Sequence, residues 1–341
     1  MRNTTLYGIA GTKFFRLNSK AILKKFGTNL QNIERSARTI YIADNGYKLL
    51  QRDQAGAEAL IVAYLCRHGN FRDLFLNGIK PHIFVGLHLF HDRLQRKIND
   101  GGHDIKCNIK ELLPIKITEL KKHPWWKEVS NLIKESDEWP AQERYYYIAK
   151  QVCHSSNYGI KAGAFCLNTL IKSQGRIVLS KKEAEQFLEI YHGLFPEIRE
   201  WHRDTERQLK ETRTLFTLQG YPIYFSGDLE NERYLKEAFS SVPQSSVGII
   251  THIAYTGLQE FIERTSVDWD LLNNNHDSFL LQFPDSPTEE QEAIKISQGF
   301  LEQELISPRG EKFKMRSEVK TGWNWGSYHL EKNPRGLKEV Y

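Results

Sequence analysis

The sequence predicts an α+β fold, in which an antiparallel sheet is combined with a largely helical subdomain. In residues 47–67 a short apolar run ends in Asp53 and passes through small residues into a helical pattern, as expected for a buried strand, a tight turn and a helix. The central residues 72–213 show mainly helical patterns. In residues 268–283 two strand-like runs flank a polar turn, which predicts a hairpin and therefore antiparallel pairing.

The composition is that of a globular protein. The 341 residues are 40% hydrophobic and 26% charged, which suits one large or two medium cores. No apolar run reaches the length of a membrane span and the N-terminus lacks the apolar core of a signal peptide, so we expect a cytoplasmic protein without a membrane partner. Four cysteines without CxxC pairing indicate reduced thiols rather than a zinc site. The net charge of +5 permits a polyanionic partner without requiring one.

The first informative stretch is KLLQRDQAGAE, residues 48–58. Its apolar residues predict a strand that ends at Asp53, and the small residues after it predict a turn into a helix. An acid at a strand end next to a helix N-terminus can hold a divalent cation. Taken alone, an aspartate that caps a helix is the simpler interpretation. A metal site therefore depends on partners from elsewhere in the chain.

A second stretch, residues 141–161, predicts a helix that ends at Gly159. On it Lys150, His154 and Tyr158 are four residues apart, so they share one face. Such a triple is often an ordinary mixed surface. A cation, an imidazole and a phenol on one face would also suit a triphosphate with a sugar and a base beside it.

The third stretch is the hairpin of residues 268–283, with His276 and Asp277 at or near its tip. Acids at a strand end and at a hairpin tip can converge on one face of an antiparallel sheet, where two carboxylates can bridge two Mg²⁺ ions. An acid, a cationic helix and a second acid, in that order, form the plan of a template-directed nucleotidyl transferase.

The remaining patterns give the order of the other elements. Residues 1–35 look irregular and read as a solvated arm or as a segment along nucleic acid, in which Arg16, Gln31 and Asn32 could reach base or sugar edges. Further predictions are a strand at 39–43, short helices with a basic surface at 97–140, helix at 181–213, a hairpin at 214–225, helix broken or kinked by Pro243 at 232–264, helix at 287–305 and a closing strand at 311–326.

At this point the chain resembles the polymerase portion of the family A (DNA polymerase I-type) DNA polymerases, the phage members most of all. Each matching segment is short, but the set has the order and spacing of the family's motifs. The matches are Asp53–Glu58 (DQAGAE) with the first metal motif, Lys150–Gly159 (Lys-x₇-Tyr-Gly) with the fingers-helix motif, His276–Ser278 (HDS) with the second metal motif, Arg16–Ser19 (RLNS) with the GRLSS segment, Asn29–Ile33 (NLQNI) with the LQNIP segment and Pro243–Ser246 (PQSS) with the PQ-type segment.

The resemblance implies a role for each matched residue. Asp53, Asp277 and the backbone carbonyl of Gln54 would hold two Mg²⁺ ions, for which Mn²⁺ can substitute. Glu58 would exclude a ribose 2′-hydroxyl, and Lys150 would bind the triphosphate and protonate pyrophosphate. The other implied nucleotide contacts are His82, Arg144, His154 and Tyr158, and the implied DNA contacts are Arg16, Gln31, Asn32, Gln244 and His276.

The chain also departs from the family pattern. Tyr146 stands where the family has an arginine four residues before the helix lysine. Either Arg144 reaches the triphosphate instead, or the triphosphate has one cation fewer. His154 replaces an aromatic residue that stacks on the sugar, which leaves discrimination against dideoxynucleotides open. Ser278 replaces a secondary carboxylate.

The implied organisation is a palm and fingers with the thumb largely absent. The predicted parts are an arm or thumb–palm junction at 1–36, palm at 37–71, fingers at 72–213 and palm at 214–341. The expected activity is DNA-directed DNA synthesis from primer-template DNA and dNTPs, in a bacterial cell or a phage-infected host. Because the thumb helices and exonuclease acids of the family are not found, we expect a split or truncated enzyme whose thumb and exonuclease come from a separate polypeptide.

Two other interpretations remain open at this point. One is a single-subunit RNA polymerase of the phage type, which shares the metal acids and the HDS motif but has a small residue at the position of Glu58. The other is a non-catalytic DNA-binding subunit that resembles a polymerase. The missing arginine and thumb favour this second alternative, whereas the intact Asp53, Asp277 and Lys150 count against it.

Overall fold

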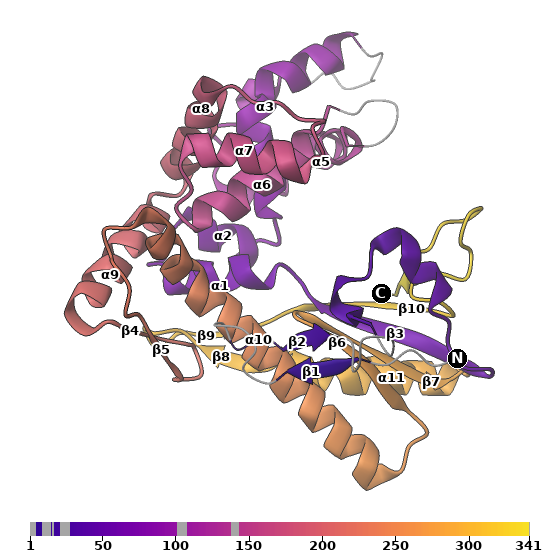
Figure 1. Cartoon of the computed structure of the whole chain (residues 1–341). Helices are drawn as coiled ribbons and strands as arrows, with labels where there is room; N and C mark the ends of the chain where they lie inside the picture. The colour runs from indigo at the N-terminus through magenta and orange to yellow at the C-terminus, as the bar shows by residue number, and fades with distance from the viewer. Residues whose placement is uncertain are drawn as a thin grey trace. The chain divides into compact units, whose positions relative to one another are not determined.

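The structure is a computed structural model that describes residues 5–8, 15, 17–20, 28–100, 108–137 and 143–340 (Figure 1). The chain divides into two compact units. The sheet unit comprises Met1–Ile61, Phe216–Ile223 and Ser241–Tyr341, and the helical unit comprises Val62–Leu215 and Tyr224–Ser240. The chain passes between the units within two helices and one hairpin: α1 (Ala57–Leu65), α10 (Glu232–Thr265) and the pair β4 (Thr214–Phe216) and β5 (Pro222–Tyr224).

The sheet unit is built on a five-stranded antiparallel sheet with the order β11-β10-β3-β7-β6. The strands are β3 (Tyr47–Gln54), β6 (Asp270–Asn275), β7 (Ser278–Pro284), β10 (Ser317–Gly322) and β11 (Lys338–Glu339). β3 and β7 lie inside the sheet, and in β7 Phe279, Leu281 and Phe283 are fully buried. Such a nearly continuous apolar run is typical of a strand that is covered on both faces. The predicted α+β class and antiparallel sheet are thus confirmed.

One face of the sheet is covered by α11 (Pro287–Leu301). Arg52 of β3 is 2% exposed and ties the sheet to this helix. Its Nε donates to Ser297 Oγ at 2.8 Å and its Nη2 to the Ile294 carbonyl at 2.6 Å. Burial lowers the pKa of Arg52 to about 10, which leaves the guanidinium charged at neutral pH. A buried charge is tolerated only when it is hydrogen-bonded, so Arg52 must keep these bonds to α11. They hold the helix in a fixed position against β3.

The residues of β3 on the face opposite to Arg52 contribute to a hydrophobic cluster. Leu49 packs with Leu280, Trp325 and Leu337, all of them buried. The indole N–H of Trp325 donates to Gln51 Oε1 at 2.9 Å, so the cluster is closed by a hydrogen bond to the same strand. Since alternate residues of a strand share a face, Asp53 lies on the face of Leu49 and Gln51.

The smaller elements of the sheet unit include one correction to the sequence prediction. They are β1 (Leu6–Gly8), β2 (Asn18–Lys20), η1 (Leu30–Asn32), η2 (Arg35–Ile40), β8 (Glu304–Ile306) and β9 (Lys312–Lys314). Residues 39–43, predicted as a strand, continue the 3₁₀ helix to Ile40 and then make an isolated bridge between Ile42 and Asn324. The β-branched residues favoured a strand locally, but the backbone there pairs with the irregular segment after β10, so a continuous ladder does not form.

The helical unit confirms most of the predicted helices. They are α2 (Asn70–Leu76), α3 (Pro81–Asp100), η3 (Ile109–Glu111), α4 (Ile117–Leu120), α5 (Trp126–Glu135), α6 (Tyr145–Asn157), α7 (Ala162–Lys172), α8 (Lys181–Leu194) and α9 (Pro196–Thr212). The structure adds α7, which the sequence analysis did not assign, and it separates residues 181–213 into two helices at Phe195–Pro196. This break is expected because proline is tolerated in the first turn of a helix but not in its interior.

The longest described helix, α10, runs through Pro243. The sequence predicted a break or kink there, and the helix continues across the proline without a break. Pro243 has no N–H, so it cannot donate the usual hydrogen bond to the preceding turn. In the part of the chain that the structure describes, no helix is both long enough and apolar enough to cross a membrane.

A buried histidine links three parts of the helical unit. His202 of α9 is 9% exposed, and its Nε2 donates to the Asn157 carbonyl at the end of α6 at 2.8 Å. Its ring stacks on Phe239, with centroids 4.2 Å apart. Burial, with a smaller effect from Arg199, lowers the pKa of His202 to about 4, although its bond to Asn157 opposes the shift. The neighbouring His192, 6.3 Å away between ring centroids, has its pKa lowered to about 3.

These histidines predict a loss of stability in mild acid. Below the unfolded-state pKa of about 6.5, the unfolded chain binds protons that the buried rings do not, so the free energy of unfolding falls as the pH falls toward about 4. For His202 alone the loss at about pH 5 is about 2 kcal/mol. Urea unfolding of His202→Gln, which keeps a hydrogen-bond donor, should show a flatter pH dependence than the parent chain. Equal slopes for His202→Gln and the parent chain would refute this account.

Candidate active site

The two predicted acids come together at one end of the central strands. Asp53 lies next to the last residue of β3, and the register of β3 with β7 pairs it with Ser278. Asp277 immediately precedes Ser278, and its backbone carbonyl accepts a hydrogen bond from the Gln54 N–H at 3.0 Å. The fold therefore brings together two residues that are far apart in the sequence.

A tight turn presents Asp277 at the tip of the β6–β7 hairpin. The Asp277 N–H donates to the Asn275 carbonyl at 2.9 Å, and His276 between them has a φ of 64°. Positive φ is uncommon outside glycine, although histidine is among the residues enriched there. The predicted hairpin with His276 and Asp277 at its tip is thus observed.

The pair of carboxylates has the electrostatics of a cation site. Burial, and secondly the charge of Asp277, raise the pKa of Asp53 to about 7, while Lys320 and Arg35 act in the opposite direction. Among the described residues no cluster of three or more histidine, cysteine or acidic side chains could hold a metal by itself. Mg²⁺ is commonly held by one or two carboxylates together with substrate phosphates and water, so an all-oxygen pair of this kind fits that ion.

Gln54 and Glu58 follow Asp53 closely. The Gln54 side chain is buried, and its Nε2 donates to Thr251 Oγ1 at 2.6 Å and to the Val247 carbonyl at 3.3 Å, which fixes the end of β3 against α10. Glu58 lies in the first turn of α1, where an acid is favoured by the helix dipole. Gln54 thus directly follows Asp53, and Glu58 comes in the first helix turn after it, as in the sequence motif.

The predicted DNA contacts have different environments. Arg16 lies outside the described residues. Gln31 is 7% exposed, and its amide connects two strands: Oε1 accepts from the Ser19 N–H at 3.0 Å and Nε2 donates to the Asn274 carbonyl at 2.9 Å. The neighbouring Asn32 is exposed. Gln244 is half-buried in α10, directly after Pro243.

In the helical unit, His82, Tyr146 and Lys150 form a cluster. His82, in the first turn of α3, shares a hydrogen bond with the Tyr146 hydroxyl of α6, with Nε2 and oxygen 2.8 Å apart. Burial, and next the charge of Lys150, lower the pKa of His82 to about 3. His82 is therefore neutral at physiological pH, and the positive charge of this cluster comes from Lys150. Tyr146, at the position where a second cation was expected, is a hydrogen-bonding residue instead.

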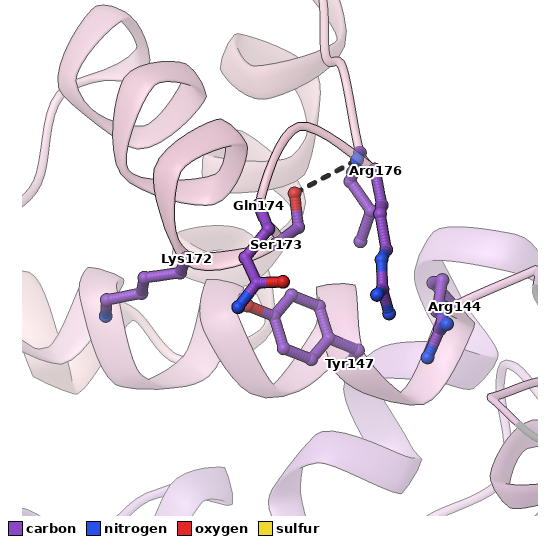
Figure 2. A pocket seen from close by; sticks show the side chains of 7 residues that line it. Arg144, Tyr147, Lys172, Ser173, Gln174 and Arg176 are labelled. Atoms are coloured by element: carbon purple, nitrogen blue, oxygen red, sulfur yellow. Dashed lines mark hydrogen bonds between the residues drawn. The ribbon is translucent and has the colours of Figure 1, made fainter. Parts of the chain in front are cut away.

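Arg144 lies apart from that cluster. It precedes α6 with a φ of 61° and lines a pocket together with Tyr147 and residues that follow α7 (Figure 2). Further along α6, the rings of His154 and Tyr158 are 5.2 Å apart and perpendicular. After Tyr158 the chain turns at Gly159, which has a φ of 68°. A Cβ at this position would lie only 3.1 Å from the Phe239 ring, so there is little room for a side chain.

Two cations near Asp53 were missed by the sequence analysis. Lys320 lies on β10 beside β3, and Arg35 begins η2, and both lower the pKa of Asp53. Lys320 could be found once the strand pairing is known. Glu318 of β10 pairs with Asp53, and Lys320, two residues further along, lies on the same face of the strand. Arg35 carried no signal, since its segment was not predicted to reach the strand end.

Comparison with known proteins shows the family to which this chain belongs. The family model for DNA polymerase family A matches residues 126–327, which is more than half of the chain. The chain therefore belongs to the family A DNA polymerases. DNA polymerase I of Treponema pallidum is 24% identical over 332 residues, which cover 94% of this chain and 27% of that protein.

A solved structure shows the same fold. The polymerase (POL) domain of Pol1 from M. smegmatis, solved in complex with DNA primer-template and dNTP, has a TM-score of 0.64 and 19% identity, and the match covers 94% of this chain and 47% of that chain. The chain thus spans about a quarter of the length of the Treponema relative and about half of the structural one. The predicted resemblance to the palm and fingers portion of this family is confirmed.

The environments of Gln31 and Asn32 give a matched test. Gln31→Ala should lower the free energy of unfolding by about 2 kcal/mol, because the Ser19 N–H and the Asn274 carbonyl lose their partners in a buried region. Asn32→Ala, an exposed neighbour, should change it by less than about 0.5 kcal/mol. Denaturant unfolding of both variants measures the difference, and equal stabilities would contradict a structural role for the Gln31 amide.

Proposed function

We propose that this chain catalyses template-directed DNA synthesis, adding dNTPs to a primer 3′-hydroxyl by two-metal phosphoryl transfer. The observation that carries this proposal is the meeting of Asp53 and Asp277 at the end of β3 and β7 in a chain of family A. Both acids lie in segments that resemble the family's metal motifs. Burial and the charge of Asp277 raise the pKa of Asp53, and a divalent cation bound to both carboxylates would relieve this repulsion. DNA and dNTPs are the proposed ligands.

Asp53, Asp277 and the Gln54 carbonyl are the groups that would hold Mg²⁺ or Mn²⁺. When bound, the two ions would lower the pKa of the primer hydroxyl and neutralise charge on the triphosphate. The chain contributes carboxylate oxygens whose mutual repulsion is largest when no cation is present. It also contributes Lys320 and Arg35, which reduce this repulsion without ligating a metal.

The residues of α3 and α6 are proposed to bind the triphosphate. Lys150 would supply the charge and a proton for pyrophosphate, and neutral His82 would offer a hydrogen bond without adding charge. His154 and Tyr158 would contact the sugar and the base. In the sheet unit, Glu58 would exclude the ribose 2′-hydroxyl by its size, and Asn32, Gln244, His276 and Arg16 would contact DNA.

A non-catalytic DNA-binding subunit is the second candidate. The observation in its favour is Tyr146, which stands in place of a cation and whose hydroxyl already bonds to His82. A site with one cation fewer would bind a triphosphate more weakly. The two candidates differ in primer extension, which only the first requires.

Primer extension with a carboxylate variant tests the proposal directly. Asp277→Asn should lower the extension rate at least about 1,000-fold, equivalent to about 4 kcal/mol, because an amide is a poor ligand for Mg²⁺. Binding of primer-template, measured by fluorescence anisotropy, should be retained. Asp270→Asn, at the other end of the same hairpin, serves as the matched control. Extension that is absent in the parent chain but accompanied by DNA binding would favour the non-catalytic alternative.

Two substitutions at one position test the sugar selectivity. If Glu58 excludes ribonucleotides by its size, Glu58→Ala should reduce the preference for dNTPs over rNTPs by at least about tenfold, about 1.4 kcal/mol. Glu58→Gln, which has nearly the same size, should keep the preference. Single-nucleotide incorporation with dNTP and rNTP measures both. An unchanged preference in Glu58→Ala would rule out this role.

A further inference from the structure

A cationic pocket in the helical unit lies outside the cluster of His82, Tyr146 and Lys150. It has a volume of about 210 Å³ and is lined mainly by polar side chains from the start of α6 and from the segment after α7 (Figure 2). The polar lining residues are Arg144, Tyr147, Lys172, Ser173, Gln174 and Arg176. The pocket therefore has room for one phosphate group with several waters.

The charges of this pocket are poorly compensated. Its three cations come from two segments that are separated in the sequence, and no carboxylate is found among the described residues that line it. Lys172 Nζ donates to a neutral amide, Gln151 Oε1, at 3.3 Å, and Arg144 Nη1 lies 3.4 Å from the backbone carbonyl of Asp137. The Asp137 carboxylate is near Arg144 but accepts the Tyr147 N–H at 3.2 Å.

The backbone holds this arrangement in place. The segment after α7 closes the helix with two hydrogen bonds, from Gly175 N–H to the Leu170 carbonyl at 2.8 Å and from Gln174 N–H to the Ile171 carbonyl at 3.0 Å. This pattern is a Schellman motif, in which the residue after the helix adopts positive φ. Here that residue is Gln174, with a φ of 54°. The Schellman motif fixes the path of the chain after α7, so that Arg176 lies near Arg144 (Figure 2).

The pocket and the His82 cluster use different faces of α6. Tyr146 and Lys150 are four residues apart and share one face. Tyr147, and Gln151 to which Lys172 bonds, share the next face, about 100° further round the helix. A ligand can therefore contact Arg144, Lys172 and Arg176 without contacting Lys150.

We propose that this pocket is a phosphate-binding site of the helical unit, formed by Arg144, Lys172 and Arg176. Guanidinium groups bind phosphate oxygens in a bidentate manner and the lysine adds a further charge. Tyr147 and Gln174 offer a ring and an amide beside the phosphate. The phosphate belongs either to a free polyphosphate or to the backbone of single-stranded DNA, since both present the same group. The proposal does not depend on catalysis by the sheet unit.

Binding of two probes to the full chain tests the proposal. Isothermal titration at low salt and without divalent metal would use inorganic pyrophosphate in one arm and single-stranded oligothymidylate in the other. Lys172→Gln combined with Arg176→Gln should weaken at least one probe by about tenfold or more, because two charge-assisted contacts are lost. Both residues are exposed, so the fold should be retained, which circular dichroism can verify.

A matched control separates a site from general electrostatics. Arg203→Gln combined with Lys210→Gln removes the same charge from exposed positions of α9 and should change either affinity less than about twofold. Weakened pyrophosphate binding in the pocket variant identifies a polyphosphate site, and weakened oligothymidylate binding alone identifies a DNA site. Equal effects of the pocket and control variants, or no effect of the pocket variant on either probe, would overturn the proposal. In Lys150→Gln the pocket should still bind the probe, whatever happens to primer extension.

Discussion

The antiparallel register between β3 and β7 decides which residues can meet at the end of the sheet. It pairs Asp53 with Ser278, and the turn before Ser278 then places Asp277 next to Asp53. Side chains alternate between the two faces of a strand, so a slip of one residue would turn Asp53 to the opposite face. The register is fixed on both faces of β3, by Arg52 on the α11 side and by Leu49 and Gln51 on the other.

The register between β3 and β7 has an electrostatic consequence. Asp53 is half-buried and Asp277 is exposed, and burial together with the charge of Asp277 raises the pKa of Asp53. The helical unit shows the opposite condition, with Arg144, Lys172 and Arg176 around one pocket. Each arrangement is unfavourable in isolation and becomes favourable with an ion of the other sign. An excess of charge of one sign, only partly compensated by neighbouring groups, is therefore the feature that both candidate sites share.

Much of the fold followed from local patterns, and the exceptions have physical reasons. The strand ending at Asp53 and the hairpin with His276 and Asp277 were predicted because short-range alternation and turn residues define them. Residues 39–43 were assigned wrongly, since a strand needs a partner that local propensity does not supply.

The individual site residues were harder to predict than the elements that carry them. The burial of the Gln31 amide depends on Asn274, 243 positions away. The pocket around Arg144 depends on how the segment after α7 packs against α6. Neither pairing has a signal within a short window of sequence. By contrast, the convergence of Asp53 and Asp277 could be predicted, because both lie in segments that resemble family motifs.

The outer strands of the sheet have a bearing on how this protein behaves at high concentration. An unprotected strand at a sheet edge is a template on which other molecules can add strands and aggregate. Here one edge, β11, consists of only Lys338 and Glu339, which is too short and too charged to serve as such a template. At the other edge, Tyr7 and Gln31 bond to the backbone of Asn274 in β6. Segments near the two ends of the chain thus protect both edges of this sheet from pairing with strands of other molecules.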